Sequence, residues 1–303
     1  MSVVQVSGLS KSYKSVKAVD DISFSVEEGE IFGIVGPNGA GKTTTVECIE
    51  GLRHADSGSV SVLGFHPQKQ SSKLKQLIGI QLQESQLPDR MKVWEALDLF
   101  GSFYEHSIPW KPLVEELGLT EKVNSYYDHL SGGQKQRLSI AMALVNDPKV
   151  VFFDELTTGL DPQARRTIWE LVRSVRDKGK TIILVTHFME EAQKLCDRVA
   201  IIDHGKLIAL DTPRNLIRSL DTGAVVRFNA SETDLLDELK RIPQVLRTEI
   251  QDGTCILQAR DLNAIGDIIK VIAARGLEFH DLSIEQPNLE DVFLALTGRA
   301  IRD

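Results

Sequence analysis

A glycine-rich loop near the N-terminus has the composition of a phosphate-binding site. Residues 36–43 match the pattern G-x-x-x-x-G-K-[ST], with a compact apolar strand expected before them, over 31–35, and a helix after them. Glycines let the backbone curl so that successive N–H groups point at phosphate oxygens, and a helix N-terminus favours the same negative charge. The predicted phosphate-binding residues are Gly36, Pro37, Asn38, Gly39, Ala40, Gly41, Lys42, Thr43 and Thr44.

Residues of this loop and of a second segment predict how a bound triphosphate would be held and hydrolysed. Lys42 is expected to bridge the β- and γ-phosphates, and the hydroxyl of Thr43 is expected to ligate Mg²⁺. An apolar strand over 150–153 ends in Asp154 and Glu155, and strand ends of a parallel sheet face the ligand. Asp154 is then expected to hold Mg²⁺, directly or through water, and Glu155 to polarise the attacking water. Without the phosphate loop, such a strand would more often lead only into a solvated loop.

A third segment, over 130–137, reads Leu-Ser-Gly-Gly-Gln-Lys-Gln-Arg. Ser131 is a suitable cap for the helix expected over 134–145, and the glycines expose N–H groups, so this is a second anion-binding helix terminus. The segment resembles the signature of the ATP-binding-cassette (ABC) ATPase family, and the resemblance covers about residues 3–212. It implies that Ser131, Gly132, Gly133 and Gln134 contact the nucleotide held by a second copy, so that two copies pair head to tail around ATP and Mg²⁺.

The resemblance implies roles for four more residues. Gln83 resembles the glutamine that senses Mg²⁺ and water, although Gln81 stands two residues away. His187, after the strand expected over 181–185, resembles the histidine that contacts the γ-phosphate; a lone histidine at a strand end is otherwise a bystander. Asp161 resembles the acid that acts across the dimer, or is a turn aspartate before a proline-started helix. Tyr13 resembles the aromatic residue that stacks on adenine, or is a core residue.

One position departs from the family pattern. Leu156 follows Glu155, where the family usually has proline. Leucine restores a backbone N–H and frees φ. The groups that would do the chemistry are unaltered, so the departure puts the loop geometry in doubt more than the activity.

The C-terminal segment 286–299 resembles the ending of bacterial drug-resistance, antibiotic-immunity and lipo-oligosaccharide export subunits. This implies ATP hydrolysis that powers export through a separate transmembrane permease, which would dock on the helical region after Gln83. The chain would then be peripheral, on the cytoplasmic face of the cell membrane. Four apolar residues of the segment recur at helical spacing and are either core or a dimer contact: Leu289, Val292, Phe293 and Leu296.

The elements expected to position these residues indicate an α/β fold. Strand-like and helical runs alternate after residue 150, which predicts a largely parallel sheet covered on both faces. With the resemblance, the expected fold is that of a phosphate-loop ABC ATPase: an antiparallel β subdomain, a parallel-sheet RecA-like core and a helical subdomain over about 84–145. The expected strands lie over 150–153, 181–185 and 199–202, and the expected helices over 163–178 and 189–196.

The texture changes after about residue 220. The expected order is strand, helix, strand, strand, helix, strand, with Asp252-Gly253 as the turn of a hairpin. That order is typical of a small ferredoxin-like α+β domain. We therefore predict a nucleotide-binding domain over 1–218 and an accessory domain over 219–303.

Composition limits the alternatives. The formal net charge of −8, from 35 basic and 43 acidic residues, argues against a nucleic-acid partner held by phosphate contacts. Three cysteines lie far apart, which favours neither a disulfide framework nor a zinc site. The longest apolar run, over 140–145, is far shorter than the roughly 20 residues of a spanning helix. A soluble ABC ATPase acting on nucleic acid or ribosomes remains the alternative, although no coiled-coil insertion or second cassette is visible.

Overall fold

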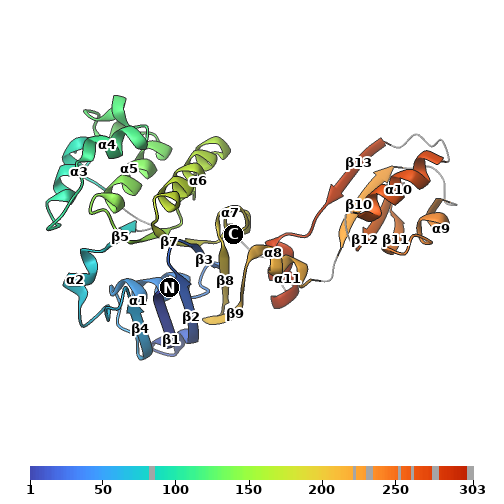
Figure 1. The fold of residues 1–303 in the computed structure, drawn as a ribbon, viewed down its shortest axis with the longest axis horizontal. Coiled ribbons are helices and arrows are strands. Elements are labelled where there is room, and N and C mark those ends of the chain that lie inside the picture. The colour runs from blue at the N-terminus through green and yellow to red at the C-terminus, as the bar shows by residue number, and fades with distance from the viewer. Residues whose placement is uncertain are drawn as a thin grey trace. The chain divides into compact units, whose positions relative to one another are not determined.

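The computed structural model describes two compact units, one over residues 1–213 and one over 214–299 (Figure 1). Helix α8 (Pro213–Arg218) lies at the junction, and the predicted domain boundary after residue 218 stays a prediction. Within the chain, the structure describes residues 1–81, 86–220, 223–229, 235–251, 254–260, 263–274 and 280–298.

The first unit is built on a six-stranded sheet of order β5-β6-β7-β3-β8-β9. The first five strands are parallel, and β9 returns antiparallel to β8. Every residue of β3, β6 and β7 is buried, as expected of a parallel sheet covered on both faces. The predicted parallel core is therefore confirmed. The strands are β3 (Ile31–Val35), β5 (Ile78–Gln81), β6 (Val150–Asp154), β7 (Thr181–Thr186), β8 (Arg198–Asp203) and β9 (Lys206–Asp211).

A second sheet, of order β2-β1-β4, is antiparallel. It contains β1 (Ser2–Tyr13), β2 (Val16–Glu27) and β4 (Ser57–Val62), and the first two are 12 residues long. Helix α1 (Lys42–Glu50) packs into one apolar core with residues of both sheets. The stacked rings of Phe24 and Phe32, 5.1 Å apart, join β2 to β3 across that core.

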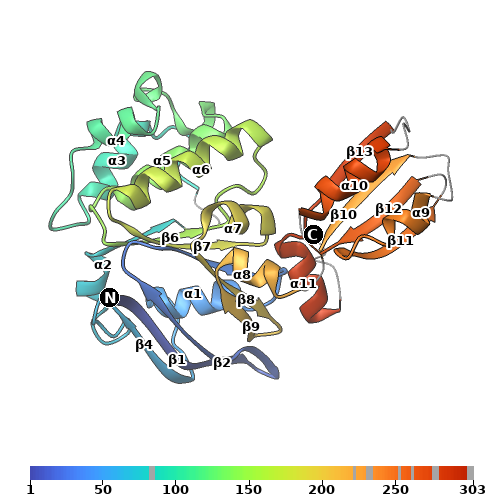
Figure 2. The ribbon, with the colours of Figure 1, turned by 45° about the vertical axis from the view of Figure 1, so that its right-hand side comes forward.

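Helices cover the other face of the central sheet and form a separate helical region. Figures 1 and 2 place α5 and α6 on the opposite side of this sheet from α1, with α3 and α4 grouped beside α5. Among the described residues, none of the helices combines the length and the apolar character needed to cross a membrane. The helices are α2 (Ser71–Lys75), α3 (Val93–Gly101), α4 (Trp110–Glu116), α5 (Gly132–Leu144), α6 (Pro162–Asp177) and α7 (Met189–Leu195), with 3₁₀ turns over Thr120–Lys122 and Tyr127–His129.

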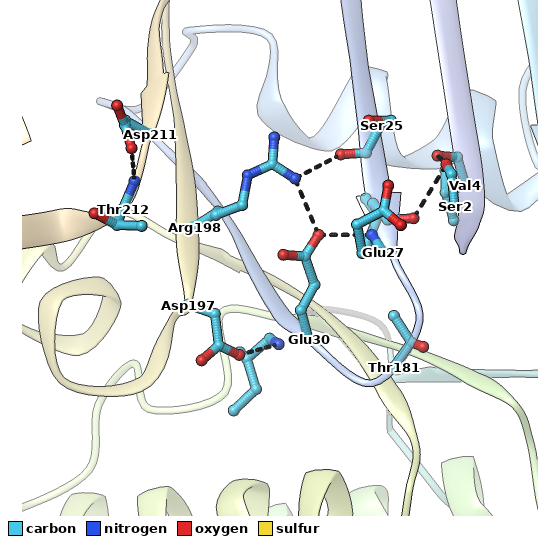
Figure 3. Close-up of polar contacts among 12 residues, drawn as sticks. Ser2, Val4, Ser25, Glu27, Glu30, Thr181, Asp197, Arg198, Asp211 and Thr212 are labelled. Carbon is cyan, nitrogen blue, oxygen red and sulfur yellow. Dashed lines mark hydrogen bonds and ion pairs between the residues drawn. The ribbon is translucent and has the colours of Figure 1, made fainter. Parts of the chain in front are cut away.

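A polar network fixes the amino-terminal ends of β3 and β8 (Figure 3). The Asp197 carboxylate accepts the Ile31 N–H at 2.8 Å, and Arg198 donates to the Ser25 carbonyl and the Glu30 carboxylate at 3.2 and 3.3 Å. Burial raises the pKa of Glu30, and the Glu27 N–H and then the Arg198 charge oppose that rise. This network ties β2 to the central sheet at the edge opposite the phosphate loop, so it holds the frame without occupying the site.

The second unit has the predicted ferredoxin-like architecture. Its antiparallel sheet has the order β11-β12-β10-β13, and apolar residues of α9 and α10 share one core with one face of that sheet. The predicted Asp252-Gly253 turn lies outside the described residues. The elements are β10 (Ala224–Asn229), α9 (Leu235–Leu239), β11 (Val245–Gln251), β12 (Thr254–Ala259), α10 (Asn263–Ala274) and β13 (His280–Glu285).

The last helix, α11 (Leu289–Thr297), is capped at its start by Asn288. The Asn288 side chain accepts the backbone N–H groups of Glu290 and Asp291 at 2.7 and 3.2 Å. Of the four apolar residues at helical spacing, Leu296 is exposed and the other three are buried: Leu289, Val292 and Phe293. Core packing thus accounts for three of the four.

Candidate functional site

The phosphate loop connects β3 to α1 in a backbone path that requires glycine. Gly36 and Gly41 have φ values of 155° and 99°, and a Cβ atom there would lie 2.0 Å from the Ile202 carbonyl oxygen and 2.2 Å from that of Ala18. Gly41 also occupies the N-cap position of α1 and leaves its first turn without a side-chain cap. The first amides of α1 can therefore serve an anion.

Lys42 points its ammonium group back into this loop. Its Nζ donates to the carbonyls of Gly36 and Pro37 at 2.8 and 3.0 Å, and the residue is 4% exposed. Burial lowers the pKa of Lys42, while the charges of Glu155 and Asp154 oppose that shift. The loop thus holds a cation within an array of backbone amides, which is an arrangement that suits phosphate oxygens.

Asp154 lies at the carboxyl end of β6 and is nearly buried. Its N–H donates to the Gln81 side-chain oxygen at 3.2 Å, while its own Oδ1 is buried with no hydrogen-bond partner among the described residues. Burial, and then the neighbouring Glu155, raise its pKa to about 6. A buried carboxylate oxygen without a donor fits a site for a hard cation, which prefers oxygen ligands.

Glu155 and His187 come together at the ends of neighbouring strands. His187 Nδ1 lies 3.1 Å from Glu155 Oε1, and the two side chains are 12% and 8% exposed. Glu155 has a left-handed backbone with φ of 51°, and its N–H donates to the Val185 carbonyl at 2.9 Å. Non-glycine residues rarely adopt this conformation except where function or surroundings hold them in it. The side chains of Glu155 and His187 are thus held together in one place.

The pKa of Asp154 gives a stability prediction for the nucleotide-free protein. The wild-type protein should lose stability as pH rises, and Asp154→Asn should not show this loss. Below about pH 4 this carboxyl is protonated in both the folded and the unfolded chain. Between about pH 4 and 6 the unfolded chain ionises first, so the free energy of unfolding falls, by up to about 3 kcal/mol. Melting temperatures measured from pH 4 to 7 should diverge in favour of Asp154→Asn.

The exposed Asp177, whose side chain is 65% exposed, supplies the control. Asp177→Asn should melt in parallel with wild type over the same pH range. If the melting temperature of Asp154→Asn also follows that of the wild type over this pH range, burial does not raise the pKa of Asp154 in the folded protein.

The signature segment forms a reciprocal cap at the start of α5. The Ser131 hydroxyl accepts the Gln134 N–H at 3.3 Å, and the Gln134 side-chain oxygen accepts the Ser131 N–H at 2.9 Å. Asp161 caps α6 without such a return bond, accepting the N–H groups of Gln163 and Ala164 at 3.0 and 2.9 Å. Ser131, Gly132, Gly133 and Asp161 line one pocket of about 320 Å³.

Tyr13 ends β1 with its ring partly open to solvent. The residue is 38% exposed, so it is not a core residue. The Arg53 guanidinium lies 5.2 Å and the Lys11 ammonium 5.8 Å from the ring centroid, and Arg53 is itself paired with Glu47. An exposed ring supported by two cations can offer a face to a planar base.

The structure adds one residue that the sequence did not indicate, Glu191, and it does not test the prediction for Gln83. Gln83 lies outside the described residues. Gln81, the neighbouring alternative, is 4% exposed and holds the Asp154 backbone. Glu191 is fully buried behind the site. No sequence signal marks it, because the adjacent Glu190 has the same side chain in the same helix.

Comparison with known proteins gives consistent results. A family model described as ABC transporter matches residues 19–158. Nod factor export ATP-binding protein I of Burkholderia lata is 40% identical over 301 residues, covering 97% of this chain and 96% of that protein. Linearmycin resistance ATP-binding protein LnrL of Bacillus subtilis (strain 168) is 35% identical over 311 residues, covering 99% and 100%.

Solved structures agree with the fold of the first unit. The structure of an ATP-binding subunit of an ABC transporter matches with a TM-score of 0.65 and 29% identity, covering 72% of this chain and 93% of that one. The ADP conformation of MJ1267, an ATP-binding cassette of an ABC transporter, matches with a TM-score of 0.62 and 27% identity, covering 71% and 92%.

Proposed function

We propose, since this chain belongs to the ABC transporter family as an ATP-binding subunit, that it hydrolyses ATP to power export through a separate permease. The observation that carries the proposal is the convergence of Lys42, Asp154, Glu155 and His187 on the carboxyl edge of the central sheet. The names of two curated relatives, one for export and one for resistance to a compound, support the outward direction.

The nucleotide would be held from three sides. The amides of residues 36–44 and the Lys42 ammonium take the phosphates, and the exposed Tyr13 ring takes the adenine. Mg²⁺ would be held by the Thr43 hydroxyl and by Asp154, whose buried Oδ1 has no other partner in the described chain, together with Gln83. When bound, the ion neutralises charge on the phosphates.

Hydrolysis then requires a water held near Glu155. The Glu155 carboxylate accepts a hydrogen bond from this water and polarises it for attack on the γ-phosphorus. In the contact at 3.1 Å, His187 would donate its Nδ1–H to the Glu155 carboxylate. A hydrogen bond to a γ-phosphate oxygen then needs a second proton, on Nε2, because an unprotonated ring nitrogen can only accept. His187 would thus fix the Glu155 side chain and contact the substrate at the same time.

A second copy of the chain completes the site. The phosphate loop begins α1 and the signature begins α5, on opposite sides of the central sheet (Figure 2). This separation supports an arrangement in which the signature of one chain serves the nucleotide bound to its partner. Ser131, Gly132, Gly133 and Gln134 would contact that nucleotide, and Asp161, in the same pocket as Ser131, would act across the dimer.

The permease would dock on a groove beside β5. This groove has a volume of about 310 Å³, and it adjoins the strand that leads into Gln83. Phe103, in its lining, is 63% exposed and adds an apolar surface to the apolar part of the groove. Docking there would hold the chain peripherally at the cytoplasmic face of the membrane. The groove is lined by Ser72, Lys75, Gln76, Ile78, Ile80, Phe103 and Tyr104.

Phe103→Glu is expected to uncouple the chain from its permease. A carboxylate in the groove lining would have to be desolvated on docking, which should weaken the complex by at least about tenfold. The ATPase rate of the isolated chain should change less than twofold. The control is Ile208→Glu, which changes another exposed apolar residue, 38% exposed, on β9. Affinity capture of the permease measures the loss; equal capture by both variants would contradict the docking surface.

The proposed function is tested by producing the chain together with a candidate permease, a protein with several membrane-spanning helices whose gene neighbours that of this chain. We expect a complex that hydrolyses Mg·ATP and whose rate rises when the exported compound is supplied. A chain that hydrolyses ATP but binds no membrane protein, and that responds instead to nucleic acid or ribosomes, would support the soluble alternative.

A further inference from the structure

A fully buried carboxyl group lies directly behind the proposed hydrolytic residues. Glu191 is 0% exposed and belongs to α7, four residues after His187. Its Oε1 accepts the Thr157 hydroxyl at 2.9 Å and the Trp169 indole N–H at 3.0 Å. Its Oε2 is buried with no hydrogen-bond partner in the part of the chain that the structure describes. One side chain therefore joins α7 to α6 and to the loop after β6.

The loop after β6 is the segment that carries Glu155. Thr157, two residues further on, is fully buried. The loop is tight, with the Thr158 N–H directed at the Glu155 carbonyl at 3.4 Å and the Leu160 N–H at that of Thr157 at 3.2 Å. Glu155 itself has the left-handed backbone, which persists only where the surroundings enforce it.

The residue at 156 does not fix the backbone conformation of this loop covalently. A proline there would fix φ of the residue after Glu155, whereas Leu156 leaves it free. Leu156 is 1% exposed and acts through packing. The first directional anchor after Glu155 is therefore the hydrogen bond from Thr157 to Glu191.

The same two segments meet again at the site itself. The His187 ring contacts the Glu155 carboxylate at 3.1 Å, and Glu191, four residues later in α7, contacts Thr157 at 2.9 Å. Two contacts, one at the site and one behind it, fix the position and the direction of the loop relative to His187. A buried hydrogen bond is well suited to this because water does not compete for it.

We propose that Glu191 is a positioning residue for ATP hydrolysis, holding the Glu155 loop against the segment of His187 through Thr157. Because it is fully buried behind Thr157, it would act through the loop and not on the nucleotide, and the inference rests on the proposed function. Misplacing a reacting group by about 1 Å can cost on the order of a hundredfold in rate. Loosening this anchor should therefore lower kcat without weakening ATP binding, which depends on the phosphate loop.

The two donors to the same oxygen provide a matched comparison. Thr157→Val replaces a hydroxyl with a methyl group on the Glu155 loop, whereas Trp169→Phe removes the N–H donated from α6. Each change leaves Glu191 Oε1 with one donor fewer, and Trp169→Phe also removes buried volume, so it should lower the melting temperature at least as much. We expect Thr157→Val to lower kcat about tenfold with KM within twofold, and Trp169→Phe to leave kcat within twofold.

Glu191 itself is tested by a conservative pair. Glu191→Gln keeps an acceptor oxygen of the same reach and should retain kcat within about threefold. Glu191→Ala should lower kcat at least as much as Thr157→Val does. A variant that combines both substitutions should have a kcat little lower than that of Glu191→Ala alone. ATP affinity, measured separately by equilibrium binding, should stay within twofold for each folded variant.

Three results would overturn the inference. One is an unchanged kcat in Thr157→Val. Another is that Thr157→Val and Trp169→Phe lose kcat equally and in proportion to their fall in melting temperature. The third is a loss of ATP affinity in place of kcat. If Glu191→Ala does not fold, the threonine and tryptophan variants still decide. A wild-type chain without ATPase activity, alone or with its permease, would overturn the proposed function and this inference together.

Discussion

Glu155→Gln should lower the steady-state rate of ATP hydrolysis by about two to four orders of magnitude, the range expected for loss of a general base. The amide has the size of the carboxylate and keeps an oxygen that can accept the His187 contact, now at 3.1 Å. It cannot accept a proton from the attacking water. The phosphate loop and Lys42 are unchanged, so ATP affinity should stay within about threefold.

Phosphate release measures the rate, and size analysis in Mg·ATP measures the second expectation. A variant that binds ATP but does not hydrolyse it should accumulate as a dimer, because the closed state is no longer reset. Glu190→Gln is the control: Glu190 is exposed on α7, three residues from His187, and its loss should leave the rate within twofold. A Glu155→Gln protein with more than a tenth of wild-type activity would remove Glu155 from the mechanism.

Lys42→Ala should weaken ATP binding by about a hundredfold. The ammonium is held in the phosphate loop by the Gly36 and Pro37 carbonyls, and removing one partner of a buried charge pair typically costs about 2–5 kcal/mol. The alanine also leaves those two carbonyls without their donor, so the melting temperature of the nucleotide-free protein should fall. Hydrolysis at fixed, subsaturating ATP should fall at least as far as affinity.

Titration with ATP by calorimetry gives the dissociation constants directly. Lys149→Ala, which removes an exposed lysine just before β6, should bind within twofold of wild type. A Lys42→Ala protein that is folded and binds ATP within fivefold of wild type would show that the backbone amides alone account for binding.

The site could be predicted wherever its residues are contiguous in sequence. Residues 36–43 are recognised as a phosphate loop from their spacing, and Asp154 and Glu155 are recognised from their place at the end of an apolar strand. Glu191 could not be found in this way. Glu190 and Glu191 are adjacent and chemically identical, and only the packing of α7 buries one and exposes the other. Gln81 is similar, because its contact with Asp154 depends on the pairing of β5 with β6.

The elements of the fold could likewise be predicted where the sequence pattern is local and clear, and not where it is short or polar. Strands such as β7, in which every residue is buried, stand out as apolar runs, and the alternation of strands and helices predicted the parallel sheet. Strand β4 was missed because serines occupy half of its six positions, and only Val60 and Val62 reach the core. Strand β5 has four residues, too few for a period to be visible. The roles assigned to Gln83 and to the accessory domain stay predictions.

The left-handed backbone of Glu155 has a consequence for any effort to engineer a more heat-resistant form. Screens that relieve conformational strain replace such residues with glycine, which adopts positive φ freely. Here that strategy would remove the side chain to which we assign the attacking water, and with it most of the expected ATPase rate. The gain in melting temperature and the loss of activity would come from the same substitution, as expected where function and stability compete at one position.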